Sequence, residues 1–147
     1  MNKPESLFLE MNEIKYLDWQ ERWSLDIISI DEEHKLLIDL VNTFIKSISE
    51  DVSAESRKRA LQDAIDHFRE HFAHEELIMR NIGYKNYLDH KSEHDDILIR
   101  AGDIMGSLDD TLSPENRQHI CDELYDWIVN HLTHYDISIR SHIEYGH

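Results

Sequence analysis

The chain has 147 residues and a mass of 17.5 kDa, enough for one domain with a single sizeable core. Two prolines and four glycines are few for this length, which disfavours a β-rich, turn-dense fold. The formal net charge of −16 would repel nucleic acid and anionic lipid, so neither nucleic acid nor a membrane is an expected partner. No apolar run approaches the ~20 residues that span a bilayer.

The N-terminal stretch MNKPESLFLEMNEIKY contains acidic residues and lacks the long apolar segment of a secretory signal. Cys121 is the single cysteine, which excludes an intramolecular disulfide and a metal cluster held by thiolates. We therefore expect the protein in the cytoplasm.

One domain over residues 1–147 is expected: an arm of about residues 1–30, a helical bundle over about 31–136 and a short C-terminal tail. The arm contains Trp19 and Trp23 and shows no sustained helical periodicity.

The first two helices follow from apolar positions spaced by three or four residues. The first begins near Asp31, which suits an N-cap, and runs to about Ser49. The second follows Ser53 and stops at Gly83, a residue typical of the position just beyond a helix.

The third helix is expected from about Asn86 to Leu108. The fourth opens with Ser113 as N-cap and Pro114 at its first position, where a missing N–H costs nothing. Short connections between long helices favour antiparallel neighbours, so we predict an all-α, antiparallel, up-down-up-down four-helix bundle.

Each predicted helix places a histidine or glutamate where leucine or isoleucine would be expected on its apolar face. The i,i+4 spacing puts His71 above Glu75 and His90 above His94. Buried without partners, such groups would each cost several kcal/mol, and a metal is the simplest partner for all of them. The candidate ligands are His34, His71, Glu75, His90, His94, His131 and, five residues after the last of these, Asp136.

Five imidazoles and two carboxylates are too many ligands for one ion, but they suit two ions bridged by both carboxylates. With one further oxo or hydroxo bridge, an ion with three histidines has six ligands and an ion with two has five. The second ion therefore keeps an open position, as small-molecule binding requires. Imidazole and carboxylate suit iron, although these ligand types do not exclude zinc, manganese or cobalt.

The pattern resembles the hemerythrin family in its single-domain bacterial form. The matching stretches are IDEEHKLL, HFAHEELIM, HKSEH and WIVNHLTHYD, which together with Trp19 cover nearly the whole chain. The resemblance implies two non-haem iron ions, Fe2+ or Fe3+, bridged by oxo or hydroxo, Glu75 and Asp136.

The resemblance also implies a role for each residue. The coordinatively saturated iron would be held by His90, His94 and His131, and the iron with the open position by His34 and His71. The apolar lining of a dioxygen pocket would come from Leu37, Phe72 and Ile128, which ordinary core packing would also explain.

The function implied is reversible dioxygen binding for transport, storage or delivery, without enzymatic turnover. The alternative is a di-iron enzyme or sensor that reacts with dioxygen, peroxide or nitric oxide, or an iron donor for cluster repair. A structural site that holds zinc, or no metal, remains a third reading. Delivery would involve a separate oxygen-consuming partner protein.

Several residues depart from the family pattern or carry no assigned role. Asp26 and Glu33 stand where bacterial members commonly have glycine and glutamine. His67 lies one turn before His71, where it either approaches the ligands or lies partly exposed, while His74 is expected at the surface. Cys121 is expected to be a small core residue.

Overall fold

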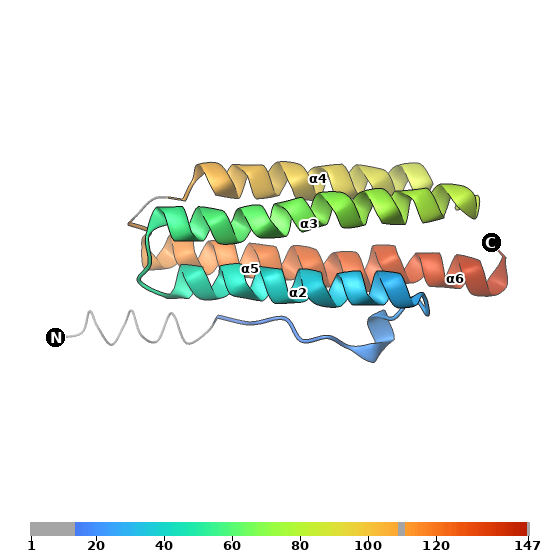
Figure 1. The fold of residues 1–147 in the computed structure, drawn as a ribbon, viewed down its shortest axis with the longest axis horizontal. Helices are drawn as coiled ribbons and strands as arrows, with labels where there is room; N and C mark the ends of the chain where they lie inside the picture. The colour runs from blue at the N-terminus through green and yellow to red at the C-terminus, as the bar shows by residue number, and fades with distance from the viewer. Residues whose placement is uncertain (1–13, 109–110, 147) are drawn as a thin grey trace.

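The computed structural model describes residues 14–108 and 111–146; the expectations for residues 1–13 and for His147 lie outside the described residues. Its helices are η1 (Glu21–Trp23), α2 (Ile28–Ser49), α3 (Ala54–Asn81), α4 (Tyr87–Gly106), α5 (Pro114–Asn130), η2 (His131–Asp136) and α6 (Ile137–Tyr145). The last three follow one another as a single long rod, so four rods lie side by side (Figure 1). The predicted four-helix bundle is confirmed.

The helix starts reflect local chemistry. The side chains of Ser53 and Ser113 accept hydrogen bonds from the backbone N–H groups of Ser56 and Asn116, which lack partners within their helices. Pro114 occupies the first turn of α5, as predicted.

The start of α2 differs from the prediction, because Asp31 lies inside the helix and is not its N-cap. Its carboxylate accepts hydrogen bonds from Leu25 N (2.9 Å) and Ser24 Oγ (2.5 Å). Asp31 therefore fastens the end of the arm to the first turn of α2.

The short C-terminal tail predicted after residue 136 is wrong, because α6 continues the fourth rod to Tyr145. Ile139 is 1% exposed and packs with Leu25, Ile30 and Met79, so this extra segment contributes to the core. It ends at Gly146, whose positive φ of 71° suits glycine.

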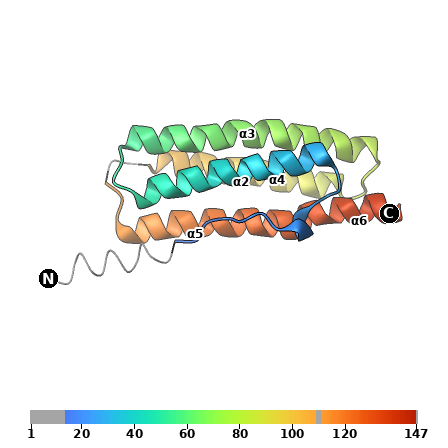
Figure 2. The same cartoon turned by 60° about the horizontal axis from the view of Figure 1, so that its bottom comes forward.

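The described part of the arm lies along the bundle (Figures 1 and 2). The Leu17 backbone N–H donates to Asn42 Oδ1 and its carbonyl accepts from Asn42 Nδ2, both at 2.8 Å. Trp23 is 1% exposed, and its indole N–H donates to Thr133 Oγ1 at 3.2 Å. These contacts tie the arm to α2 and η2.

The apolar core consists of two separate clusters. The larger contains residues of α2, α3, α4 and α5, such as Phe44 and Phe68, and the smaller contains Ile30, Met79 and Ile139 among others. All the predicted metal ligands are absent from both clusters, although they are equally buried.

Candidate metal centre

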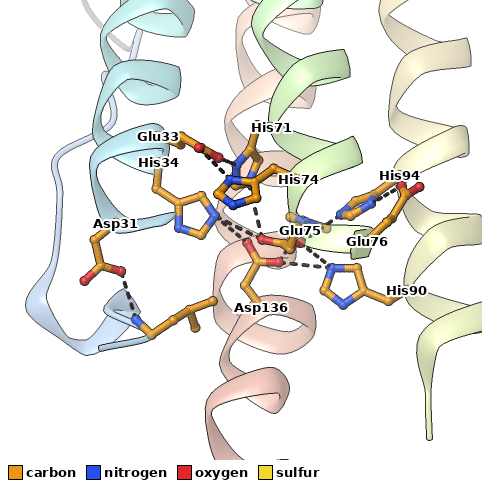
Figure 3. Close-up of polar contacts among 12 residues, drawn as sticks. Asp31, Glu33, His34, His71, His74, Glu75, Glu76, His90, His94 and Asp136 are labelled. Carbon is orange, nitrogen blue, oxygen red and sulfur yellow. Dashed lines mark hydrogen bonds and ion pairs between the residues drawn. The ribbon is translucent and has the colours of Figure 1, made fainter. Parts of the chain in front are cut away.

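Seven polar side chains meet inside the bundle, and they are the seven predicted ligands. None is more than 4% exposed. Figure 3 shows the imidazoles and carboxylates converging from different rods. The contributing segments are α2 (His34), α3 (His71 and Glu75), α4 (His90 and His94) and η2 (His131 and Asp136).

The seven side chains form two overlapping groups. Within each group one ligand atom per residue lies within 4.8 Å of all the others. Glu75 and Asp136 belong to both groups. The larger group adds three imidazoles (His90, His94 and His131), and the smaller adds two (His34 and His71).

The oxygens of Glu75 divide between these groups. Glu75 Oε1 lies 2.9 Å from His90 Nε2 and 3.0 Å from His94 Nε2. Glu75 Oε2 lies 3.4 Å from His34 Nε2 and 3.3 Å from His71 Nε2. One carboxylate therefore presents one oxygen to each group.

Asp136 shows the same division. Its Oδ1 lies 3.0 Å from His90 Nε2 and 3.1 Å from His131 Nε2, whereas Oδ2 lies 3.1 Å from His34 Nε2. Each carboxylate therefore directs one oxygen to the group with three imidazoles and the other oxygen to the group with two.

The inward-facing atoms fit a pair of cations. Among the described residues, Nε2 of His34, His71, His90 and His131 and both oxygens of Asp136 are buried without a hydrogen bond. Unpaired burial of this kind is costly, whereas a metal ion between imidazole nitrogens and carboxylate oxygens satisfies both. The donor set of nitrogen and carboxylate oxygen suits iron.

The pKa values of the clustered side chains also indicate a site for cations. Burial by itself would lower the pKa of His34, but Asp136 and Glu75 raise it to about 10. Burial is likewise outweighed at His90, where the two carboxylates raise the pKa to about 9. Burial opposes ionisation of Glu75 and Asp136, yet the surrounding imidazoles hold the pKa of each carboxyl below its usual range. Positive charge therefore stabilises the two carboxylates, and protons on His34 and His90 supply it when no metal is bound.

Two glutamates hold ligand histidines from outside. His71 Nδ1 donates to Glu33 Oε1 and His94 Nδ1 donates to Glu76 Oε2, each at 2.8 Å (Figure 3). Each bond places the proton on Nδ1 and leaves Nε2 free to face the centre. We did not predict these two roles; the one sequence signal is that Glu33 and Glu76 each adjoin a candidate ligand.

Glu33 also accepts hydrogen bonds from His67 and His74, neither of which is a predicted ligand. His74 Nδ1 donates to Glu33 Oε2 at 2.7 Å, and His67 Nε2 donates to the Glu33 backbone carbonyl at 2.8 Å. The His67 ring also stacks on His71, with centroids 6.3 Å apart. His74 is 36% exposed and so lies at the surface as expected, but its ring is also held by Glu33. Of the two positions expected for His67, near the ligands or partly exposed, the structure shows the one near the ligands.

A π-helical segment, η2, carries His131 and Asp136. Residues five apart point in different directions on a regular α-helix, but the wider π turn returns both side chains to one face. This explains how ligands separated by five residues reach the same centre.

The three residues predicted to line a dioxygen pocket lie in the larger apolar cluster. Leu37 and Phe72 are each 4% exposed and Ile128 is 2% exposed. The Phe72 ring stacks on His94 with a centroid separation of 3.9 Å and an interplanar angle of 6°. Cys121 is 1% exposed, and burial raises the pKa of its thiol to about 12, as suits a core residue.

Sequence comparison identifies the architecture. A family model described as "Hemerythrin HHE cation binding domain" matches residues 26–136, which include all seven converging side chains. The chain belongs to the hemerythrin family. Proteins of this family bind a non-haem di-iron centre and typically bind oxygen.

Individual hemerythrins match most of the chain. A bacteriohemerythrin of Clostridium acetobutylicum is 26% identical over 122 residues, which cover 80% of this chain and 94% of that protein. One of Methylococcus capsulatus is 30% identical, over 72% of this chain and 79% of the relative. Myohemerythrin-1 of Phascolopsis gouldii is 28% identical, over 83% and 90%. The crystal structure of a hemerythrin mutant shares the fold, with a TM-score of 0.70, 22% identity and coverage of 86% of this chain and 93% of that one.

Proposed function

We propose that this hemerythrin binds dioxygen reversibly at a carboxylate-bridged di-iron centre, for transport, storage or delivery. The observation that carries the proposal is the division of the seven ligands into groups of three and two imidazoles around two shared carboxylates. An ion held by the group with two imidazoles would have one protein ligand fewer than its neighbour, which would leave a position for a small molecule.

The ligand roles follow from the two groups. His90, His94 and His131 would hold one iron, and His34 and His71 the other. Glu75 and Asp136 would bridge, because each directs one oxygen to either side. When bound, the two irons supply an open position and one electron each to dioxygen.

The protein residues around the centre would keep the reaction reversible. Leu37, Phe72 and Ile128 form an apolar wall that excludes water and limits proton access. Glu33 and Glu76 orient His71 and His94 and increase the basicity of their inward nitrogens.

No helix of the described residues is both long enough and apolar enough to cross a membrane. We propose the cytoplasm as the location, in keeping with the single cysteine. Dioxygen is the proposed ligand.

Visible absorption of the iron-loaded protein tests the proposal. The protein is reduced without oxygen, exposed to air and returned to an oxygen-free atmosphere. A band that appears in air and disappears on oxygen removal, over repeated cycles, is the expected result. A rapid, irreversible change to the ferric spectrum would instead favour a di-iron enzyme or sensor.

A further inference from the structure

A groove runs between α4 and the α5–η2 part of the fourth rod. One hollow of about 370 Å³ is lined by Asp89, His90 and Tyr135 among others. A second hollow, of about 260 Å³, is lined by Glu93, Asp96 and Asp126 among others. Asn130 lines both, so the two hollows adjoin.

The groove is strongly negative. Asp89, Glu93, Asp96 and Asp126 contribute carboxylates, and the described residues lining the two hollows include one arginine and no lysine. That arginine, Arg100, pairs with Asp96 at 3.0 Å (Nε to Oδ2), so four carboxylates face one guanidinium in the two hollows.

Tyr135 connects this groove to the buried centre. Its ring stacks on His131, with centroids 5.7 Å apart and planes 14° apart. The same ring meets His90 edge-on at 5.6 Å. Tyr135 is half-buried, so one aromatic side chain reaches from the floor of the groove to two of the imidazoles in the three-histidine group.

His90 reaches the groove directly. It is 1% exposed yet lines the first hollow, and its Nδ1 has no hydrogen bond among the described residues. By contrast, Nδ1 of His71 and Nδ1 of His94 are held by Glu33 and Glu76. The centre therefore borders the groove at His90 and Tyr135.

We propose that this groove docks a positively charged one-electron donor protein, whose electron reaches the three-histidine iron through Tyr135 and His90. The proposal rests on the di-iron function, because reversible dioxygen binding requires ferrous iron and an oxidised centre must be restored. In each encounter the donor loses one electron and one ferric ion becomes ferrous. Two encounters restore the diferrous centre. Negative charge in the groove increases the encounter rate with a cationic partner.

Stopped-flow reduction of the iron-loaded ferric protein tests the docking charge. Hexaammineruthenium(II), a cationic one-electron donor, serves as the probe, and dithionite is the anionic comparison. The double variant Glu93→Gln/Asp126→Asn removes two groove charges while keeping the Asp96–Arg100 pair. The control, Glu55→Gln/Asp63→Asn, removes two exposed charges from a different hollow, along α3.

The groove variant should be reduced by the cationic probe at least about threefold more slowly than wild type, with a weaker salt dependence. The control should match wild type, and dithionite should not reduce the groove variant more slowly. Equal slowing in both double variants would show only the effect of net charge and would overturn the docking site.

A second comparison of reduction rates tests whether the electron passes through the ring of Tyr135. Tyr135→Phe keeps the ring and should retain the wild-type rate, whereas Tyr135→Leu should be slower. Tyr145→Leu, on the exposed end of α6, is the matched control. Equal rates for the Phe and Leu variants, or faster reduction of Tyr135→Leu, would exclude Tyr135 as the route.

Iron content, reduction potential and the ferric spectrum are measured first on every variant. They separate slow electron delivery from damage to the centre. Wild type that takes up no iron would refute the proposed function itself, whereas an iron-loaded, oxygen-binding wild type with unchanged groove variants would refute this inference alone.

Discussion

Two of the ligand histidines, His71 and His94, are held at both ring nitrogens. His71, for example, faces Glu75 through Nε2 at 3.3 Å and donates through Nδ1 to Glu33 at 2.8 Å. His94 is held between Glu75 and Glu76 in the same way, with Phe72 stacked on its ring. A ligand held at both ends loses little further freedom when a metal binds, which favours a preformed site.

Replacement of His94 by leucine should abolish binuclear iron loading. The change removes one of three imidazoles and leaves Glu76 without the N–H that it accepts from. Iron per chain, measured after anaerobic reconstitution, should fall well below two. His119→Leu removes a 75% exposed histidine and should load normally, while full loading and oxygen binding in the His94 variant would contradict the assignment.

Replacement of Ile128 by alanine should keep the iron and speed dioxygen exchange or autoxidation. The loss of a buried side chain opens the apolar wall and costs about 2–5 kcal/mol of stability. Ile120→Ala, which removes another buried isoleucine of α5, is the matched control for that cost. If both variants exchange dioxygen at the wild-type rate, Ile128 does not line the pocket.

At the scale of secondary-structure elements, the junction between the arm and α2 explains a departure from the family pattern. Asp26 has a φ of 59°, the left-handed region that glycine adopts without strain. Aspartate tolerates this region better than most residues, because its short side chain forms local hydrogen bonds. The backbone conformation at this position would therefore suit a glycine.

The variant Asp26→Ala should lower the free energy of unfolding by about 1 kcal/mol, because alanine is strained at positive φ. Asp26→Gly relieves that strain, and Asp26→Asn removes only the charge that faces Arg140 at 3.4 Å. Chemical denaturation of the three variants should place alanine lowest. Equal stability of the alanine and glycine variants would show that the strain is negligible.

At the scale of the whole molecule, a buried layer of charge interrupts an apolar bundle. Two carboxylates and five imidazoles occupy the level between the two core clusters. Their mutual attraction must offset the cost of removing them from water, and it does so fully only when positive charge is present. Protons or metal ions can supply that charge, so the stability of the bundle should depend on pH and on metal together.

The metal-free protein should lose stability as pH rises from about 6.5 to 9 and beyond. The pKa values of His34 and His90 are about 10 and 9 in the folded chain against 6.5 when unfolded, so their stabilisation is complete below pH 6.5 and disappears as those groups deprotonate. Glu75 and Asp136, with lowered pKa values, lose their contribution only at acid pH.

Calorimetry of metal-free and iron-loaded protein between pH 6.5 and 9 measures this effect. The melting temperature should fall with pH in the metal-free form and change less in the iron-loaded form, where metal ions replace the protons. A metal-free melting temperature that rises over this range would show that the carboxylates do not hold protons on the imidazoles.

The helix faces and the identity of the converging side chains follow from the pattern of residues along the chain. A period of three to four residues tells which positions of a helix face the core, and His34, His71 and His94 occupy such positions. The same rule does not by itself place Asp136 on the face of His131, because a five-residue spacing matches a common face only in a π turn. It also missed the helix that ends at Tyr145.

The way in which these faces meet depends on how the helices pack against one another. Periodicity orients a side chain about its own helix axis but says nothing about the depth and rotation of one helix against another. For that reason the contact of Glu33 with His71, the division of the Glu75 oxygens and the approach of Tyr135 to His131 emerged from packing alone. The local sequence selects ligands by type and face, and long-range packing sets the partner that each atom meets.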